Sequence, residues 1–159
     1  MRVFVGISLS LMLLSCDDEK QIEPPWDNFS VEVNSIRWEG ATQIHHYFNS
    51  NDSLAILGII PEPEGLIELG IKFQGAGEYP LTGINCAYHA TIGHDARIGE
   101  YRFDPNNLGK LVITEYEPKT KFIRGTFEVE LKKVFANPDT VPDILIFREG
   151  KFEGKIQED

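Results

Sequence analysis

The chain has 159 residues and is acidic, with 25 aspartates and glutamates, 15 lysines and arginines, and a formal net charge of −10. This charge argues against a nucleic acid as partner, because phosphate binding needs a basic surface. With only two cysteines the chain is not a disulfide-rich scaffold, so an apolar core must stabilise its fold.

Residues 1–15 are typical of a bacterial signal peptide. They carry one base, Arg2, and no acid, and their apolar run is too short to cross about 30 Å of hydrocarbon as a helix. The run ends in Leu13-Leu14-Ser15-Cys16, which resembles the lipobox of bacterial lipoproteins. We therefore expect Cys16 to become the first mature residue and to carry covalent lipid, with no other cofactor. The alternative is an ordinary buried thiol behind an apolar N-terminus.

Residues 16–25 are acidic and end in Pro24-Pro25, a composition that predicts an extended tether reaching at most roughly 30 Å. Without the signal peptide the chain keeps 14 bases and 25 acids, a net charge of −11 that opposes adsorption to anionic headgroups. We expect contact with the membrane through the lipid alone. The acidic residues behind Cys16 resemble a surface-export signal of one Gram-negative phylum, although a solvated spacer would have the same composition. The expected location is the bacterial cell envelope, at the outer membrane and surface-exposed if that signal operates.

Residues 26–159 are the right length for one domain. Apolar residues recur there at every second position, which predicts strands rather than helices. The clearest example is 66–73, where Ile67, Leu69, Ile71 and Phe73 share one face. One face of that strand should be buried and the other solvated.

The remaining predicted strands follow in chain order, each separated from the next by residues that favour turns. Prolines at 61 and 63 interrupt the pattern, and the firmest predicted hairpin joins 110–116 to 122–134. We expect strands at 29–33, 36–38, 42–48, 53–60, 66–73, 86–92, 100–103, 110–116 and 122–134, with 144–147 and 151–156 forming a pair or one bent strand. Nine or ten short strands predict an all-β fold, either a single antiparallel β-sandwich or a closed or partly open, calycin-like β-barrel.

Four motifs occur in an order that resembles an uncharacterised family of small β-rich bacterial lipoproteins. The family pattern is G-x-Y-x-L, then G-x-(I/V)-x-I-T, then (I/V)-x-G-T-F-x-F, then G-x-F. The matching segments are 75–81, 109–116, 123–129 and 149–152, and the resemblance covers roughly residues 31–156. Val129 departs from it, since an aromatic residue is usual there. The resemblance implies a β-rich fold and an envelope location, but no catalytic residue, because no activity is established for the family.

The histidines are the candidates for a metal site. His45 and His46 are adjacent on a predicted strand, so their side chains point to opposite faces. His89, His94 and Asp95 could converge on one ion if the turn between them folds back, with ligands that suit zinc. The alternative is exposed histidines on a strand and a loop, and we expect no metal.

Catalytic motifs are absent from the sequence: it has no Gly-x-Ser-x-Gly elbow, no phosphate loop and no dinucleotide fingerprint. Cys86 alternates with Tyr88 and Ala90 on one strand face, which predicts a buried, inert thiol. Glu115 and Glu117 share a strand face, as the charged residues of solvated sheet surfaces commonly do. We therefore expect no enzyme activity.

These observations predict a membrane-anchored binding or interaction module whose partner is an envelope or surface protein or a glycan. A surface platform could come from among the aromatic residues Trp26, Trp38, Tyr47, Phe48, Tyr79, Tyr88, Tyr101 and Phe103, although most of them should be core. Two alternatives remain open. One is a small-ligand carrier with an internal apolar pocket lined by residues such as Ile56, Ile71 and Phe127; the other is a structural envelope protein.

Overall fold

A computed structural model describes residues 28–47, 52–81, 85–93, 95–107 and 109–157. The predicted signal peptide, the tether and Cys16 lie outside the described residues, as do Trp26, Phe48 and His94. Within the described ranges no helix is long and apolar enough to cross a membrane.

Ten strands make up the described fold, so the prediction of an all-β chain with nine or ten strands is confirmed. They are β1 (Asn28–Val33), β2 (Ile36–His46), β3 (Ser53–Pro61), β4 (Glu64–Lys72), β5 (Gly77–Pro80), β6 (Cys86–Ile92), β7 (Ala96–Phe103), β8 (Gly109–Glu117), β9 (Phe122–Ala136) and β10 (Ile144–Gln157).

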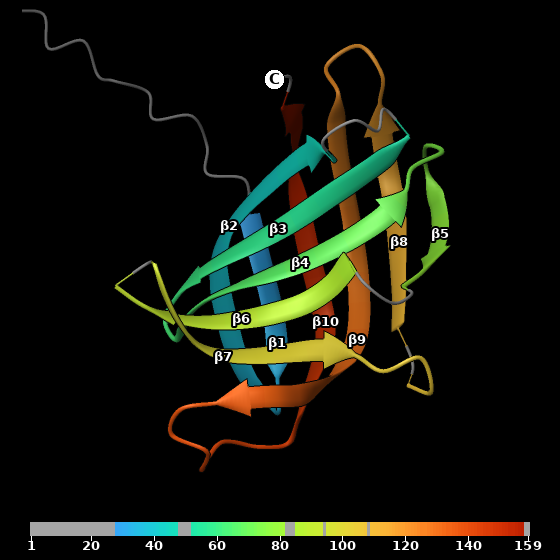
Figure 1. The fold of residues 1–159 in the computed structure, drawn as a ribbon. Helices are drawn as coiled ribbons and strands as arrows, with labels where there is room; N and C mark the ends of the chain where they lie inside the picture. Colours follow the sequence, from blue (N-terminus) through green and yellow to red (C-terminus); the bar gives the residue numbers. More distant parts are fainter. Residues whose placement is uncertain (1–27, 48–51, 82–84, 94, 108, 158–159) are drawn as a thin grey trace, which may run out of the picture.

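The strands form one hydrogen-bonded sheet whose pairings return on themselves (Figure 1). Strands β1, β2, β3, β4, β6, β7, β9 and β10 pair in that order, and β10 pairs back with β1. Past Asn28, where β1 begins, β10 and β2 pair directly and in parallel, at Ile156 and Ile44. Every other pairing is antiparallel.

The ring is not a regular barrel, because β9 has two successive neighbours along one edge. Its first part, as far as Val129, pairs with β8, and its last part, from Leu131, pairs with β7. Strand β5 extends the sheet from β8, so β8 and β5 stand beside the ring as a branch (Figure 1). The fold is therefore not the predicted β-sandwich, which would consist of two separate antiparallel sheets. Its strands form one sheet, which closes through the pairing of β9 with β10 and includes a parallel pairing.

The core fills the inside of the ring. Alternate residues of the ring strands point inward, as the period of two predicts, and Ile67, Leu69 and Ile71 of β4 are all buried. Ile56 and Phe127 are also buried there. One continuous apolar cluster joins side chains from nine strands with Leu81, which follows β5.

Strand boundaries differ from the predictions in three places. The segments predicted at 36–38 and 42–48 form one continuous strand, β2, because Gly40 packs closely on the backbone of Ile59 and pairing continues through it. Strand β5 was not predicted, and β7 begins earlier, at Ala96. The last two predicted segments form one bent strand, β10, which is one of the two predicted arrangements, with a bulge between Phe147 and Gly150.

Candidate binding cleft

An apolar cleft of about 450 Å³ opens at one end of the ring. The β3–β4, β6–β7 and β9–β10 connections meet there, at the lower left of Figure 1. The volume lies in the range of pockets that hold small molecules or an anchoring side chain. Its lining is mainly apolar: Trp38, Pro63, Tyr88, Ala90, Ile92, Ile98, Gly99, Tyr101, Ala136, Pro138, Val141, Pro142 and Leu145, with Glu62, Glu64, Thr91 and Asn137 as the polar members.

Aromatic rings from three strands lie together at the cleft. Tyr88 of β6 pairs in register with Tyr101 of β7, and their ring centroids are 6.1 Å apart. The half-buried ring of Trp38 lies 5.5 Å from Tyr88 on the other side. Gly65 of β4 leaves room for Tyr88, since a Cβ there would come within 2.4 Å of the tyrosine hydroxyl. Close ring packing of this kind gives the cleft a rigid aromatic wall.

The β9–β10 loop is fixed over the cleft by polar contacts. The Tyr101 hydroxyl donates a hydrogen bond of 2.9 Å to the carbonyl of Pro142. The Asn137 N–H donates to the carbonyl of Ile98 at 2.8 Å. Lys133 Nζ lies 2.7 Å from a carboxylate oxygen of Asp139 and 2.8 Å from one of Asp143. A loop held at several points keeps the cleft formed in the absence of a ligand.

The opposite side of the cleft is held by Glu64. Its carboxylate accepts a hydrogen bond of 2.7 Å from the Thr91 hydroxyl and one of 3.1 Å from the Gly93 N–H. Glu64 begins β4, Thr91 lies near the end of β6, and Gly93 follows β6, so these bonds join the β3–β4 connection to the β6–β7 connection.

Exposed apolar side chains gather around this end of the ring. Among the described residues seven large apolar side chains are exposed, and all lie in or near the connections at this end: Ile36, Ile59, Ile92, Val134, Phe135, Val141 and Ile144. The Asn34 side chain ties the β1–β2 turn to the backbone of β10 at Ile144 and Ile146. Apolar side chains exposed next to a cleft are a common feature of binding sites.

The aromatic wall is uncharged at neutral pH. Burial, with the neighbouring Tyr101, raises the pKa of Tyr88 to about 12. Burial also raises the pKa of Tyr101. The charged groups that line the cleft are therefore two carboxylates, those of Glu62 and Glu64. The described lining contains no lysine or arginine.

A second polar cluster lies on the outer face of β6 and β7. Glu100 is buried between Arg97, whose guanidinium is 2.9 Å away, and Arg102, which donates a further hydrogen bond. Burial would raise the pKa of Glu100, but the two arginines outweigh it and hold the pKa below its ordinary value. His89 pairs in register with Glu100, and burial together with the charge of Arg97 lowers the pKa of the histidine.

This cluster is where the predicted metal ligand His89 lies. Two arginines beside His89 oppose the approach of a cation. Within the described ranges no group of three or more histidine, cysteine, aspartate and glutamate side chains is placed to hold a metal ion. Asp95 lies in the β6–β7 turn, and His94, the third predicted ligand, is outside the described residues.

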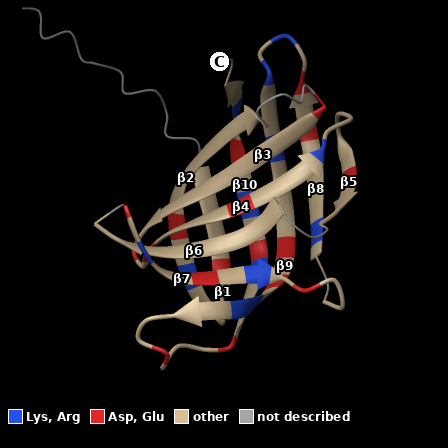
Figure 2. Ribbon diagram, viewed as in Figure 1, with Lys and Arg blue, Asp and Glu red and all other residues tan. Residues whose placement is uncertain are grey.

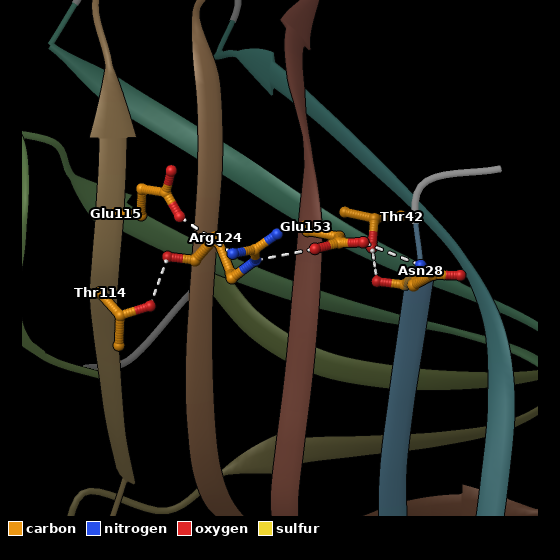
Figure 3. Close-up of polar contacts among 6 residues, drawn as sticks. All are labelled: Asn28, Thr42, Thr114, Glu115, Arg124 and Glu153. Atoms are coloured by element: carbon orange, nitrogen blue, oxygen red, sulfur yellow. Dashed lines mark hydrogen bonds and ion pairs between the residues drawn. The ribbon is translucent and has the colours of Figure 1, made fainter. Parts of the chain in front are cut away.

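A polar ladder crosses the outer face of β8, β9, β10 and β1 (Figure 3). Arg124 of β9 contacts Glu115 of β8 at 3.0 Å and Glu153 of β10 at 2.8 Å. Glu153 also accepts a hydrogen bond from the Asn28 side chain of β1. About half of the Arg124 side chain is exposed, so the ladder sets strand register more than it adds stability. Figure 2 shows charges of both signs interspersed over these strands.

Cys86 is buried in the core, as predicted. Burial, reinforced by the charge of Glu68, raises the pKa of its thiol to about 12. The thiol therefore stays protonated and unreactive at neutral pH. Cys16, the predicted lipid carrier, lies outside the described residues.

The expectation that most of the candidate aromatic residues are core is confirmed, because Tyr88 and Tyr101 are buried in the core cluster and Trp38 packs against it. Of the eight aromatic residues proposed from the sequence, the structure brings Trp38, Tyr88 and Tyr101 together at the cleft, while Tyr79 and Phe103 pack against the core elsewhere. Ile92, Val141 and Leu145 were missed, because their place in the cleft depends on how three distant turns meet. Ile56, Ile71 and Phe127 belong to the core and do not line this cleft.

Comparisons with known proteins add no relative: no family model, no curated protein and no solved structure matches this chain.

Proposed function

We propose that the chain is a lipid-anchored cell-envelope protein whose β-domain is a non-catalytic binding module, and that the apolar cleft receives an apolar group of its partner. The observation that carries this proposal is the preformed cleft, with a rigid aromatic wall and exposed isoleucine and valine side chains at its mouth. Hydrophobic burial would supply most of the binding free energy.

The place where β1 begins supports the proposal. Strand β1 begins at Asn28 and runs toward the β1–β2 turn, so the preceding chain joins roughly 20 Å of strand away from the cleft end (Figure 1). A lipid on Cys16 would therefore leave the cleft accessible. In the all-β domain the closed ring of paired strands supports the cleft, and β8 and β5 form a branch beside the ring.

A second candidate is a small-ligand carrier, and the cleft volume of about 450 Å³ favours it. Native mass spectrometry on gently purified protein would distinguish the two. A removable mass in excess of the lipidated chain identifies a carried ligand, whereas the bare lipidated mass favours a partner that docks from outside.

The cleft itself is tested with indole, a small neutral apolar probe. The full-length Cys16→Ser chain is suitable, because without lipid no detergent micelle competes for indole. Methyl NMR spectra should shift at Ile92, Val141 and Leu145 and not at Ile44. Ile92→Asp should abolish the shifts, whereas Ile36→Asp, a change at an equally exposed isoleucine outside the lining, should keep them. Unchanged spectra at the three cleft residues would disprove the proposal.

A further inference from the structure

We infer that the partner is a protein segment in which an apolar side chain is flanked by lysine or arginine. This inference rests on the proposed function and specifies the chemistry of the group that the cleft receives. Two independent features carry it: the sign of the charge around the cleft and the extent of the exposed apolar surface beyond it.

The charged residues that line the cleft are acidic. Glu62 is exposed at the β3–β4 turn, and Glu64 beside it also lines the cleft. On the opposite side, Lys133 is paired with both Asp139 and Asp143, so one cation faces two carboxylates there. Figure 2 shows acidic residues on the connections at this end of the ring.

A partner that buries apolar surface here therefore meets the exposed carboxylate of Glu62 at the rim. A cationic group next to the apolar anchor would pair with Glu62, whereas an anionic group would be repelled.

The apolar surface is larger than a small ligand would cover. Ile36, Val134, Phe135 and Ile144 are exposed at the same end but do not line the cleft. They come from the β1–β2 turn, the end of β9 and the start of β10. An anchor pocket surrounded by further apolar residues and an outer charged rim is the usual anatomy of a protein interface. A protein segment would cover this area, and a small amine would not.

The test uses four probes on the full-length Cys16→Ser chain, with dissociation constants from methyl NMR titrations. Two are short peptides with the same tryptophan-leucine anchor, flanked by lysines in one and by glutamates in the other. The third is the same peptide with serine flanks. The fourth is tryptamine, a small amine that carries the cation without the peptide.

The lysine-flanked peptide should bind about three- to tenfold more tightly than the glutamate-flanked one, with the serine-flanked peptide between them, and more tightly than tryptamine. Glu62→Gln should reduce the preference for lysine by about twofold or more. Glu128→Gln, a change at an exposed carboxylate on the outer face of β9, should leave it unchanged.

Each contrary result has a separate meaning. Equal binding of the three peptides, or no effect of Glu62→Gln, would overturn the cationic partner while leaving the cleft as a binding site. Tryptamine binding as tightly as the lysine-flanked peptide would overturn the protein segment in favour of a small ligand. If indole and all four probes fail to shift the cleft methyl groups, the proposed function itself fails.

Discussion

Glu100 is a buried carboxylate held between two arginines that are each about half exposed. We predict that Glu100→Gln lowers the free energy of unfolding at pH 7 by about 1 kcal/mol, because it removes charged hydrogen bonds while the arginines can be hydrated. Urea unfolding of the two proteins measures the difference. Glu128→Gln, a change at an exposed carboxylate, should have no comparable effect.

The same carboxylate predicts a direction for the pH dependence. The pKa of Glu100 lies below its ordinary value of 4.5 in the folded protein, so the folded state binds fewer protons at this site than the unfolded state. Its contribution to stability is therefore complete above about pH 4.5 and is lost as the pH falls through the folded-state pKa. The difference between wild type and Glu100→Gln should shrink between pH 5 and pH 3. A difference that stays constant over this range would contradict the assignment.

Glycines that face aromatic rings recur across the strands of the ring. On β9 and β10 the arrangement is reciprocal: Gly125 pairs with Phe152, and Gly150 pairs with Phe127. A Cβ on Gly150 would lie 2.4 Å from the ring of Phe127, and one on Gly125 would lie 2.5 Å from the ring of Phe152. The G-T-F and G-x-F motifs are thus explained by packing, since each glycine makes room for the phenylalanine of the other strand.

This packing predicts the result of a double-mutant cycle. Gly150→Ala should destabilise the fold by about 1–3 kcal/mol through overpacking, and Phe127→Leu should destabilise it by leaving a cavity. The double variant should be more stable than the sum of the two effects implies, because the new methyl group occupies space that the ring has left. Urea unfolding of the four proteins gives the coupling free energy, and simple additivity would show that the two residues do not share this space.

The branch and the ring should differ in local stability. Strand β5 has four residues and pairs only with β8 among the described strands, whereas β9 and β10 are each paired along two edges. Amide protons of β5 should therefore exchange with solvent faster than those in the centres of β9 and β10. Hydrogen exchange measured by NMR checks this order. Equal protection of β5 and β9 would mean that branch and ring open as one unit.

At the scale of the whole molecule, the predictions that depend on neighbouring residues are confirmed, whereas the features that depend on the pairing of distant strands were not predicted. The alternation in β4, the β8–β9 hairpin and the buried position of Cys86 follow from neighbouring residues, and all three are confirmed. The return of β10 to β1 and the two partners of β9 depend on strands far apart in the chain, which no local period encodes. The cleft depends on the same long-range closure, so the sequence indicated its aromatic residues but not their meeting point.

The predicted anchor has its own test at the scale of the whole molecule. Signal peptide, lipobox and acidic tether predict that lipid on Cys16 alone holds the protein to the membrane, since the acidic domain has no electrostatic attraction to anionic lipid. Cys16→Ser should move the protein from the membrane fraction to the soluble fraction after a carbonate wash. Cys86→Ser, a change at the other cysteine, should leave it in the membrane fraction, because that thiol lies in the core. If the Cys16→Ser protein stayed with the membrane after the loss of residues 1–15, a surface of the domain would have to bind lipid directly, and the apolar cleft end would become the first candidate for that contact.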